Sequence, residues 1–311
     1  MKILFMGTPD FALFSLKGLC ENGYDVIGVV TQPDKPKGRG YVLTPPPVKV
    51  YALERGIPVY QPNSLRTEEF ASLLSELDPD LIAVVAYGKI LPKNVLDYPK
   101  YGCVNVHGSL LPEYRGAAPM QQAIIDGKKI TGITTMFMAE GLDTGDMLLK
   151  AECEIAENDN FKIIHDRLGA LGADLLQKTV DGLERGEITP IPQDHSKSTH
   201  TSKITKEDCL IDFHKDCDTV HNLIRGLSPI PLAFTHLPDG KLLKIVESTV
   251  CERESVNEVV GKVISSDNER IRISCARGSI YVHKLLPEGK GRMNAGDFIR
   301  GRKINDGDIL N

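Results

Sequence analysis

The sequence predicts two domains: a doubly wound, mostly parallel α/β sheet, followed by a smaller OB-like β-barrel. Three observations support this prediction. The chain has 311 residues, which is enough for two domains. Short apolar runs alternate with amphipathic stretches in the first part of the chain, as in βα units that close into a parallel sheet. After a polar segment with two prolines, one helix and then only short strands are expected, which is typical of a small barrel.

The elements of the first domain follow from hydrophobic periodicity. Strands are expected over residues 2–6, 26–30, near 59, 81–87, 104–106 and 133–138. Helices are expected over residues 11–22, 68–76, 119–126 and 160–185. The first strand, helix and strand form a βαβ unit, which almost always closes right-handed. The turn after the first strand lacks the glycine spacing of a dinucleotide-binding loop, so no nicotinamide cofactor is expected.

The second domain begins after a polar segment over residues 190–206, which we interpret as a linker. The expected limits are residues 1–189 for the catalytic domain, 190–206 for the linker and 207–311 for the second domain. A helix is expected over residues 218–226. Strands are expected over residues 232–237, 242–248, 259–265, 270–274 and 279–285. A fold of this kind often binds nucleic acids, although fold alone does not give function.

Composition narrows the class of protein. No apolar run approaches the roughly 20 residues that span a bilayer, and no signal peptide is evident, so a cytoplasmic protein without membrane contact is expected. The seven cysteines are scattered and form no C-x-x-C pair, which predicts neither a disulfide framework nor a metal site. We also expect a monomer.

Basic side chains are concentrated in two stretches, although the net charge is −5. Residues 31–49 contain four Lys or Arg against one Asp, and residues 270–303 contain nine against two acidic residues. Such patches on an acidic protein suggest a polyanionic partner. The alternative is a solvated face whose charge is neutralised by acids that lie nearby in the fold.

An amide, an imidazole and a carboxylate form the candidate catalytic set. Asn105 and His107 are two residues apart at the end of a predicted strand, so their side chains point to the same face. Asp143 lies in a later polar loop and can favour the charged imidazole. An amine attacking a carbonyl needs oxyanion donors and a group that takes up its proton. The alternative is a polar pair that only satisfies a loop.

The residues around this set resemble the folate-dependent formyltransferases, and within them the members that act on tRNA. The signature of that family is Asn-x-His, then Ser-Leu-Leu-Pro, then a distant Asp. This chain matches it at Asn105-Val106-His107, Ser109-Leu110-Leu111-Pro112 and Leu142-Asp143-Thr144-Gly145-Asp146. Further matches are Gly7-Thr8-Pro9-Asp10-Phe11, Thr31-Gln32-Pro33-Asp34, Gly38-Arg39-Gly40, Pro47-Val48-Lys49 and Tyr114-Arg115-Gly116-Ala117-Ala118-Pro119.

The resemblance implies a Rossmann-like formyltransferase fold and a reaction. A formyl group would pass from 10-formyltetrahydrofolate, the co-substrate, to the α-amine of methionine on initiator methionyl-tRNA, with no metal. It implies catalytic roles for Asn105, His107 and Asp143. The implied folate site consists of Ser109, Leu110, Leu111, Pro112, Tyr87, Gly88 and Ile90. The implied tRNA contacts are Lys35, Lys37 and Arg39.

Two other functions stay open on the sequence. A sugar-nucleotide formyltransferase would use the same catalytic set but has no evident use for the basic stretches. A non-catalytic RNA-binding protein would explain the basic stretches but leaves Asn105 and His107 without a purpose. Formyl transfer to charged tRNA separates all three functions.

Overall fold

The computed structural model describes residues 1–37, 41–267, 269–301 and 303–311. These residues divide into two compact units. The first consists of Met1–Gly116, Thr131–Cys153 and His165–His200, and the second of Ala117–Ile130, Glu154–Ile164 and Thr201–Asn311. Neither unit is continuous in sequence, and the limits 1–189, 190–206 and 207–311 stay a prediction. In the described part of the chain, every helix is too short or too polar to cross a bilayer.

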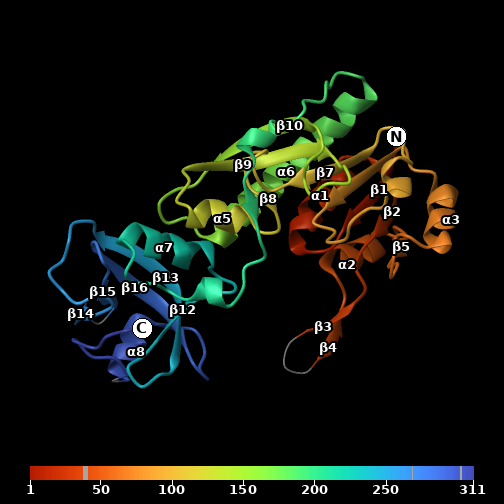
Figure 1. The fold of residues 1–311 in the computed structure, drawn as a ribbon. Coiled ribbons are helices and arrows are strands. Elements are labelled where there is room, and N and C mark those ends of the chain that lie inside the picture. Colours follow the sequence, from red (N-terminus) through yellow and green to blue (C-terminus); the bar gives the residue numbers. More distant parts are fainter. Residues whose placement is uncertain (38–40, 268, 302) are drawn as a thin grey trace. The chain divides into compact units, whose positions relative to one another are not determined.

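A seven-stranded sheet forms the middle of the first unit (Figure 1). Its order is β10 (Met147–Glu154), β9 (Ile130–Phe137), β7 (Cys103–His107), β6 (Leu81–Val85), β1 (Lys2–Gly7), β2 (Asp25–Val30) and β5 (Val59–Tyr60). Strands β7, β6, β1, β2 and β5 run parallel, whereas β9 is antiparallel to β7. The predicted mostly parallel sheet is confirmed.

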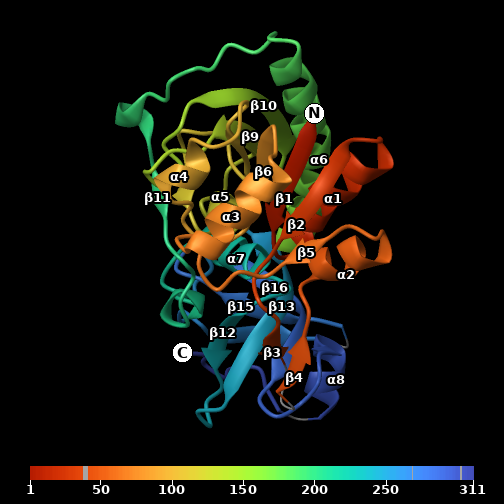
Figure 2. The same ribbon diagram turned by 90° about the vertical axis from the view of Figure 1, so that its right-hand side faces the viewer.

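Helices cover both faces of this sheet, as Figures 1 and 2 show. They are α1 (Asp10–Glu21), α2 (Pro47–Glu54), α3 (Glu68–Leu77), α4 (Lys93–Leu96) and α6 (Phe161–Glu184). On one face, Phe70 of α3 and Val95 of α4 pack in a cluster with Leu4 of β1. On the other face, Gly172 of α6 lies against Val106 of β7, where an added Cβ would come within 3.0 Å of Val106 Cγ1. This doubly wound arrangement buries each strand of the middle of the sheet on both sides.

Several short or peripheral elements of the first unit were not predicted. Helix α2 begins at Pro47, where proline is compatible with the first turn because it needs no amide hydrogen there. Strands β3 (Lys35–Lys37) and β4 (Val42–Thr44) pair as an antiparallel hairpin within the same basic stretch. Strand β10 ends the sheet order, and after two buried residues it alternates partly buried with exposed residues, the pattern of a half-solvated strand. The short strands β8 (Arg115–Gly116) and β11 (His200–Thr201) pair with each other.

Antiparallel strands form the second unit, which confirms the predicted second domain. The order is β12 (Ala233–His236), β13 (Leu242–Glu252), β16 (Ser279–Pro287), β15 (Ile271–Ser274) and β14 (Val263–Ser266), with β17 (Met293–Asn294) also paired to β16. Its helices are α5 (Pro119–Ile125), α7 (Cys217–Gly226) and α8 (Ala295–Arg300), and the short 3-10 helix η2 covers Glu207–Cys209. The strand expected from residue 259 begins only at Val263, after a turn.

Helix α7 explains why segments far apart in the sequence belong to the second unit. Gly226 lies so close to Ile125 of α5 that an added Cβ would be 2.7 Å from its Cγ1. The buried Arg225 donates to the carbonyl oxygens of Ala156 and Asp159 at 3.0 and 2.9 Å. These contacts satisfy a buried cation, which would otherwise be costly. They also attach residues 154–164 to α7.

Candidate active site

The end of β7 places the first two candidate residues. The alternation of a strand puts Asn105 and His107 on the face opposite Val106, which faces α6. Across the antiparallel ladder to β9, Asn105 is opposite Met136 and His107 is opposite Thr134. The Asn105 side chain is partly exposed and, among the described residues, its amide makes no hydrogen bond. It therefore has donors to offer a ligand.

His107 is held by both ring nitrogens. Its Nε2 lies 2.9 Å from the carbonyl oxygen of Tyr114, and because a carbonyl only accepts, Nε2 carries the hydrogen. The Nδ1 atom lies 3.6 Å from Oδ2 of Asp143. In the neutral ring, Nδ1 therefore has a free lone pair beside a carboxylate. That arrangement lets His107 take up a proton and stabilises the resulting cation.

The Asp143 loop, between β9 and β10, is tightly constrained. Asp143 has a left-handed backbone with φ of 51°, which is uncommon for residues other than glycine. Its Oδ2 accepts a hydrogen bond of 2.8 Å from the backbone N–H of Gly116. Gly145 leaves no space for a side chain, since an added Cβ would lie 1.8 Å from the carbonyl oxygen of Phe137. The loop thus fixes the carboxylate beside His107.

Other strand ends meet at the same edge of the sheet. Thr8, which follows β1, and Gln32, which follows β2, donate to the carbonyl oxygen of Tyr87 at 3.2 and 3.1 Å. Tyr87 follows β6, its ring is buried, and burial raises its pKa to about 12. Its side chain therefore packs in the core, and its backbone reaches the edge. Gly88 and Ile90 are exposed, and the carboxyl edge of a parallel sheet is where α/β proteins bind ligands.

The Ser109–Pro112 segment is an internally bonded loop. The Ser109 hydroxyl donates to the carbonyl of Glu113 at 2.6 Å. Thr134 Oγ1 donates to the Ser109 carbonyl at 2.8 Å and accepts from the Leu111 N–H at 3.0 Å. Ser109 and Leu111 are fully buried, whereas Leu110 and Pro112 are partly exposed. Thr134 was not predicted as a site residue, because only strand pairing places it opposite His107.

The predicted tRNA contacts lie on and next to the β3–β4 hairpin. Lys35 is exposed at the start of β3, and Lys37 ends that strand. Arg39 lies outside the described residues. Tyr41 and the first two residues of β4, Val42 and Leu43, are 81%, 67% and 62% exposed. A basic segment with exposed apolar side chains suits a nucleic acid end with unstacked bases.

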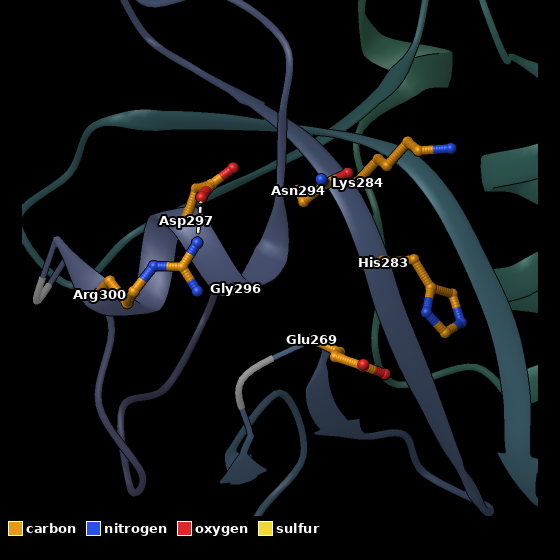
Figure 3. A pocket seen from close by; sticks show the side chains of 7 residues that line it. All are labelled: Glu269, His283, Lys284, Asn294, Gly296, Asp297 and Arg300. Carbon is orange, nitrogen blue, oxygen red and sulfur yellow. Dashed lines mark hydrogen bonds and ion pairs between the residues drawn. The ribbon is translucent and has the colours of Figure 1, made fainter.

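Acidic neighbours neutralise part of the basic stretch in the second unit. Among the described residues, four of its cations form ion pairs: Arg270 with Asp267, Arg272 with Glu252, Lys284 with Glu247 and Arg300 with Asp297. Figure 3 shows the last pair beside a cavity of about 230 Å³. This cavity is lined by Glu269, His283, Lys284, Asn294, Gly296, Asp297 and Arg300. Burial lowers the pKa of His283, so it adds little positive charge.

A second cavity in the same unit, of about 480 Å³, is more basic. It is lined by Asn160, Lys162, Ser228, Pro229, Val246, Glu247, Lys284, Arg292, Met293 and Asn294. Arg292 donates to the carbonyl of Pro229 at 2.8 Å. Three cations against one carboxylate make this cavity suited to an anion such as a phosphate.

One further side chain near the candidate set was interpreted as part of a linker. Gln193 is buried and bonds both the Asp143 loop and Arg115. No local pattern in the polar segment 190–206 distinguishes it from its exposed neighbours. Its partners are distant in sequence, so only the fold reveals its place.

Comparison with known proteins covers nearly the whole chain. Residues 1–180 match the family model described as formyl transferase, and residues 203–303 match the formyl transferase C-terminal domain. The methionyl-tRNA formyltransferase of Ruminiclostridium cellulolyticum is 49% identical over 310 residues, which cover 100% of this chain and 99% of that protein. The protein of the same name from Bacillus velezensis is 47% identical, with 99% and 97% covered.

Solved structures resemble the fold at low sequence identity. WlaRD, described as a sugar 3N-formyl transferase, has a TM-score of 0.67 and 20% identity, and covers 94% of this chain and 99% of its own. The N-formyltransferase from Helicobacter canadensis has a TM-score of 0.68 and 20% identity, with 91% and 98% covered. At 20% identity the similarity supports the fold and not the function.

Proposed function

The chain belongs to the formyl transferase family, and we propose that it transfers the formyl group of 10-formyltetrahydrofolate to the free α-amine of methionine on initiator methionyl-tRNA. The product is N-formylmethionyl-tRNA, which serves translation initiation. The methionyl-tRNA formyltransferases of Ruminiclostridium cellulolyticum and Bacillus velezensis are 49% and 47% identical to this chain over nearly their whole length. The observation that carries the mechanism is His107 Nδ1 at 3.6 Å from Asp143, with Asn105 on the same face of β7.

The reaction is an acyl transfer between two nitrogens. The α-amine, with a pKa of about 7.7–8.0, is about one-tenth to one-sixth neutral near pH 7, and this neutral fraction attacks the formyl carbon. The new C–N bond gives a tetrahedral intermediate with a negative oxygen. The bond from that carbon to N10 of the folate then breaks, and the proton lost by the amine balances the one gained at N10. Stabilising the oxyanion and moving this proton are the demanding tasks.

The three candidate side chains divide these tasks. The amide of Asn105, which has no hydrogen bond within the described residues, donates to the oxyanion. His107 takes up the amine proton at Nδ1, because Nε2 is committed to the carbonyl of Tyr114. The Asp143 carboxylate stabilises the resulting imidazolium.

The folate binds at the carboxyl edge between the ends of β6 and β7. Exposed Gly88 and Ile90 form one wall, and the partly exposed Leu110 and Pro112 form the other. Apolar walls with a few backbone donors suit a flat heterocycle. Buried Ser109 and Leu111, and the buried ring of Tyr87, support these walls from behind.

The tRNA is held through its acceptor end and its phosphates. In this proposal, Lys35, Lys37 and Arg39 of the first basic stretch contact the acceptor end, where unstacked bases can be distinguished. The cations of the second unit contact phosphates without reading sequence. Because the substrate is charged tRNA, we propose that the enzyme acts in the cytoplasm. We also propose that it is a monomer. Sedimentation of the purified chain measures the oligomeric state.

A panel of amine acceptors tests the proposal. The purified chain is mixed with 10-formyltetrahydrofolate and, separately, with initiator methionyl-tRNA, elongator methionyl-tRNA or a dTDP-linked amino sugar. We expect fast formylation of the initiator, slow formylation of the elongator and none of the sugar. Formylation of the sugar alone would assign the chain to the sugar enzymes. Binding of tRNA without formylation of any acceptor would leave a binding protein.

A further inference from the structure

We propose that Gln193 is a positioning residue that holds the Asp143 loop in its catalytic conformation. Gln193 touches neither proposed substrate; it acts through the loop that carries Asp143. The inference rests on the proposed function, because it takes Asp143 as the partner of His107. It assigns a role to the segment that follows the long helix α6 and that the sequence predicted to be a linker.

The side-chain amide of Gln193 bonds the Asp143 loop with its nitrogen and Arg115 with its oxygen. Gln193 Nε2 donates to the carbonyl oxygens of Asp143 and Gly145, at 2.8 and 2.7 Å. Its Oε1 accepts from Nε and Nη2 of Arg115, at 3.0 and 2.6 Å. The amide thus uses both donors and both lone pairs. A buried side chain that is saturated in this way has one allowed orientation, and it fixes its partners as well.

The loop needs such a restraint. Asp143 adopts a left-handed backbone, a conformation that costs free energy and persists only when the surroundings enforce it. Residues 140–142 are exposed, so they do not pack the turn into the core. Gln193 binds the carbonyls of Asp143 and Gly145, on each side of Thr144. The pair of bonds keeps Asp143 Oδ2 within 3.6 Å of His107.

Arg115 connects this restraint to the rest of the site. Its guanidinium is buried, and its backbone N–H donates to the carbonyl of Thr199 at 2.9 Å. Gly116, the next residue, donates to Asp143 Oδ2. The segment 115–116 therefore reaches Asp143 twice, directly through Gly116 and indirectly through Gln193. Both contacts fix the carboxylate that stands beside the histidine.

Gln193→Glu is the most specific perturbation. It keeps the size of the side chain and the acceptors for Arg115, but it replaces two N–H donors by an oxygen that repels the loop carbonyls. We expect kcat to fall about 10- to 100-fold, with KM for both substrates within about twofold, because the loop shifts while the substrate walls stay in place. Gln193→Met, which keeps the volume without polar atoms, should give the same split.

His195→Ala is the matched control. His195 Nδ1 also contacts Nη2 of Arg115, at 3.1 Å, but it lies on the exposed 3-10 turn η1 (His195–Lys197) and, within the described residues, makes no hydrogen bond to the loop. We expect this variant to keep kcat within about twofold of wild type, since loss of an exposed contact has small effects. An equal loss of kcat in Gln193→Glu and His195→Ala would show that the loss comes from the contact with Arg115 and not from the contact with the loop.

A double-variant cycle separates positioning from a general structural role. In an Asp143→Ala background, Gln193→Glu should change kcat by less than about twofold, because the group it positions is gone. The same 10- to 100-fold loss in both backgrounds would overturn the inference. So would a wild-type kcat for both Gln193 variants.

Hydrogen exchange tests the loop without using activity. The Phe137 N–H donates to the Asp146 carbonyl at 2.9 Å across the base of the loop, so its exchange should accelerate in Gln193→Glu and not in His195→Ala. If wild type transferred no formyl group but this amide exchanged faster in the variant, the proposed function would fail while the contact stood. Unchanged exchange together with a normal kcat would show that Gln193 does not position the Asp143 loop.

Discussion

Asn105→Ala removes the amide that we assign to the oxyanion and that supports no other described part of the fold. The side chain is partly exposed and has no hydrogen bond within the described residues, so the free energy of unfolding should change by less than about 0.5 kcal/mol. Loss of one oxyanion donor costs about 2.7–4 kcal/mol in the transition state, or about 10²- to 10³-fold in rate. The variant therefore separates chemistry from folding.

Single-turnover formylation on preformed complexes measures this effect. Enzyme with saturating 10-formyltetrahydrofolate is mixed with charged initiator tRNA, and urea unfolding measures stability in parallel. Asn94→Ala, the same chemical change at an exposed position on α4, is the control and should leave the rate unchanged. A rate for Asn105→Ala within about threefold of wild type would refute the oxyanion assignment, since it is far below the expected loss.

Four other perturbations have distinct expected results. His107→Ala should lower both the rate and, by about 1–3 kcal/mol, the stability in urea, because it removes a buried, hydrogen-bonded ring; full stability would contradict its burial. Burial lowers the pKa of His221, so this group stabilises the fold above pH 6.5 and the contribution is lost as pH falls below it; urea midpoints at pH 7.5 and 5.5 should differ more in wild type than in His221→Asn. Gly145→Ala should slow formylation, because its Cβ would lie 1.8 Å from the Phe137 carbonyl; a wild-type rate would show that the loop is free to move. Arg39→Ala should reduce kcat/KM for the initiator tRNA far more than it reduces salt-dependent binding, and an unchanged kcat/KM would make the hairpin segment a simple connection.

Buried strands and the amphipathic helices were predictable, because their periodicity depends on local residues. The strands β1, β6 and β7 are buried on both faces, and each appears in the sequence as a short, nearly continuous apolar run. Placing Asn105 and His107 on one face needed only the alternation of a strand. Helix α2 was missed, although Pro47 is compatible with its first turn.

Contacts between distant segments were not predictable from one sequence. Gln193 reaches Asp143 across 50 residues, and nothing local marks it. The ion pairs of the basic stretch were not predictable either, because Arg272 pairs with Glu252, which lies outside that stretch. Long-range pairing depends on strand register, which no local pattern in the second unit specified.

Transfer of a labelled formyl group tests the central claim most directly. Wild type and Asp143→Asn are each given 10-formyltetrahydrofolate with a ¹³C-formyl carbon and initiator methionyl-tRNA, and the amino acid released from the tRNA is analysed by mass spectrometry. We predict ¹³C-formylmethionine from wild type and a much slower appearance from the variant. Absence of label on methionine with wild type would contradict the proposed function, and equal rates for both would contradict the assigned site.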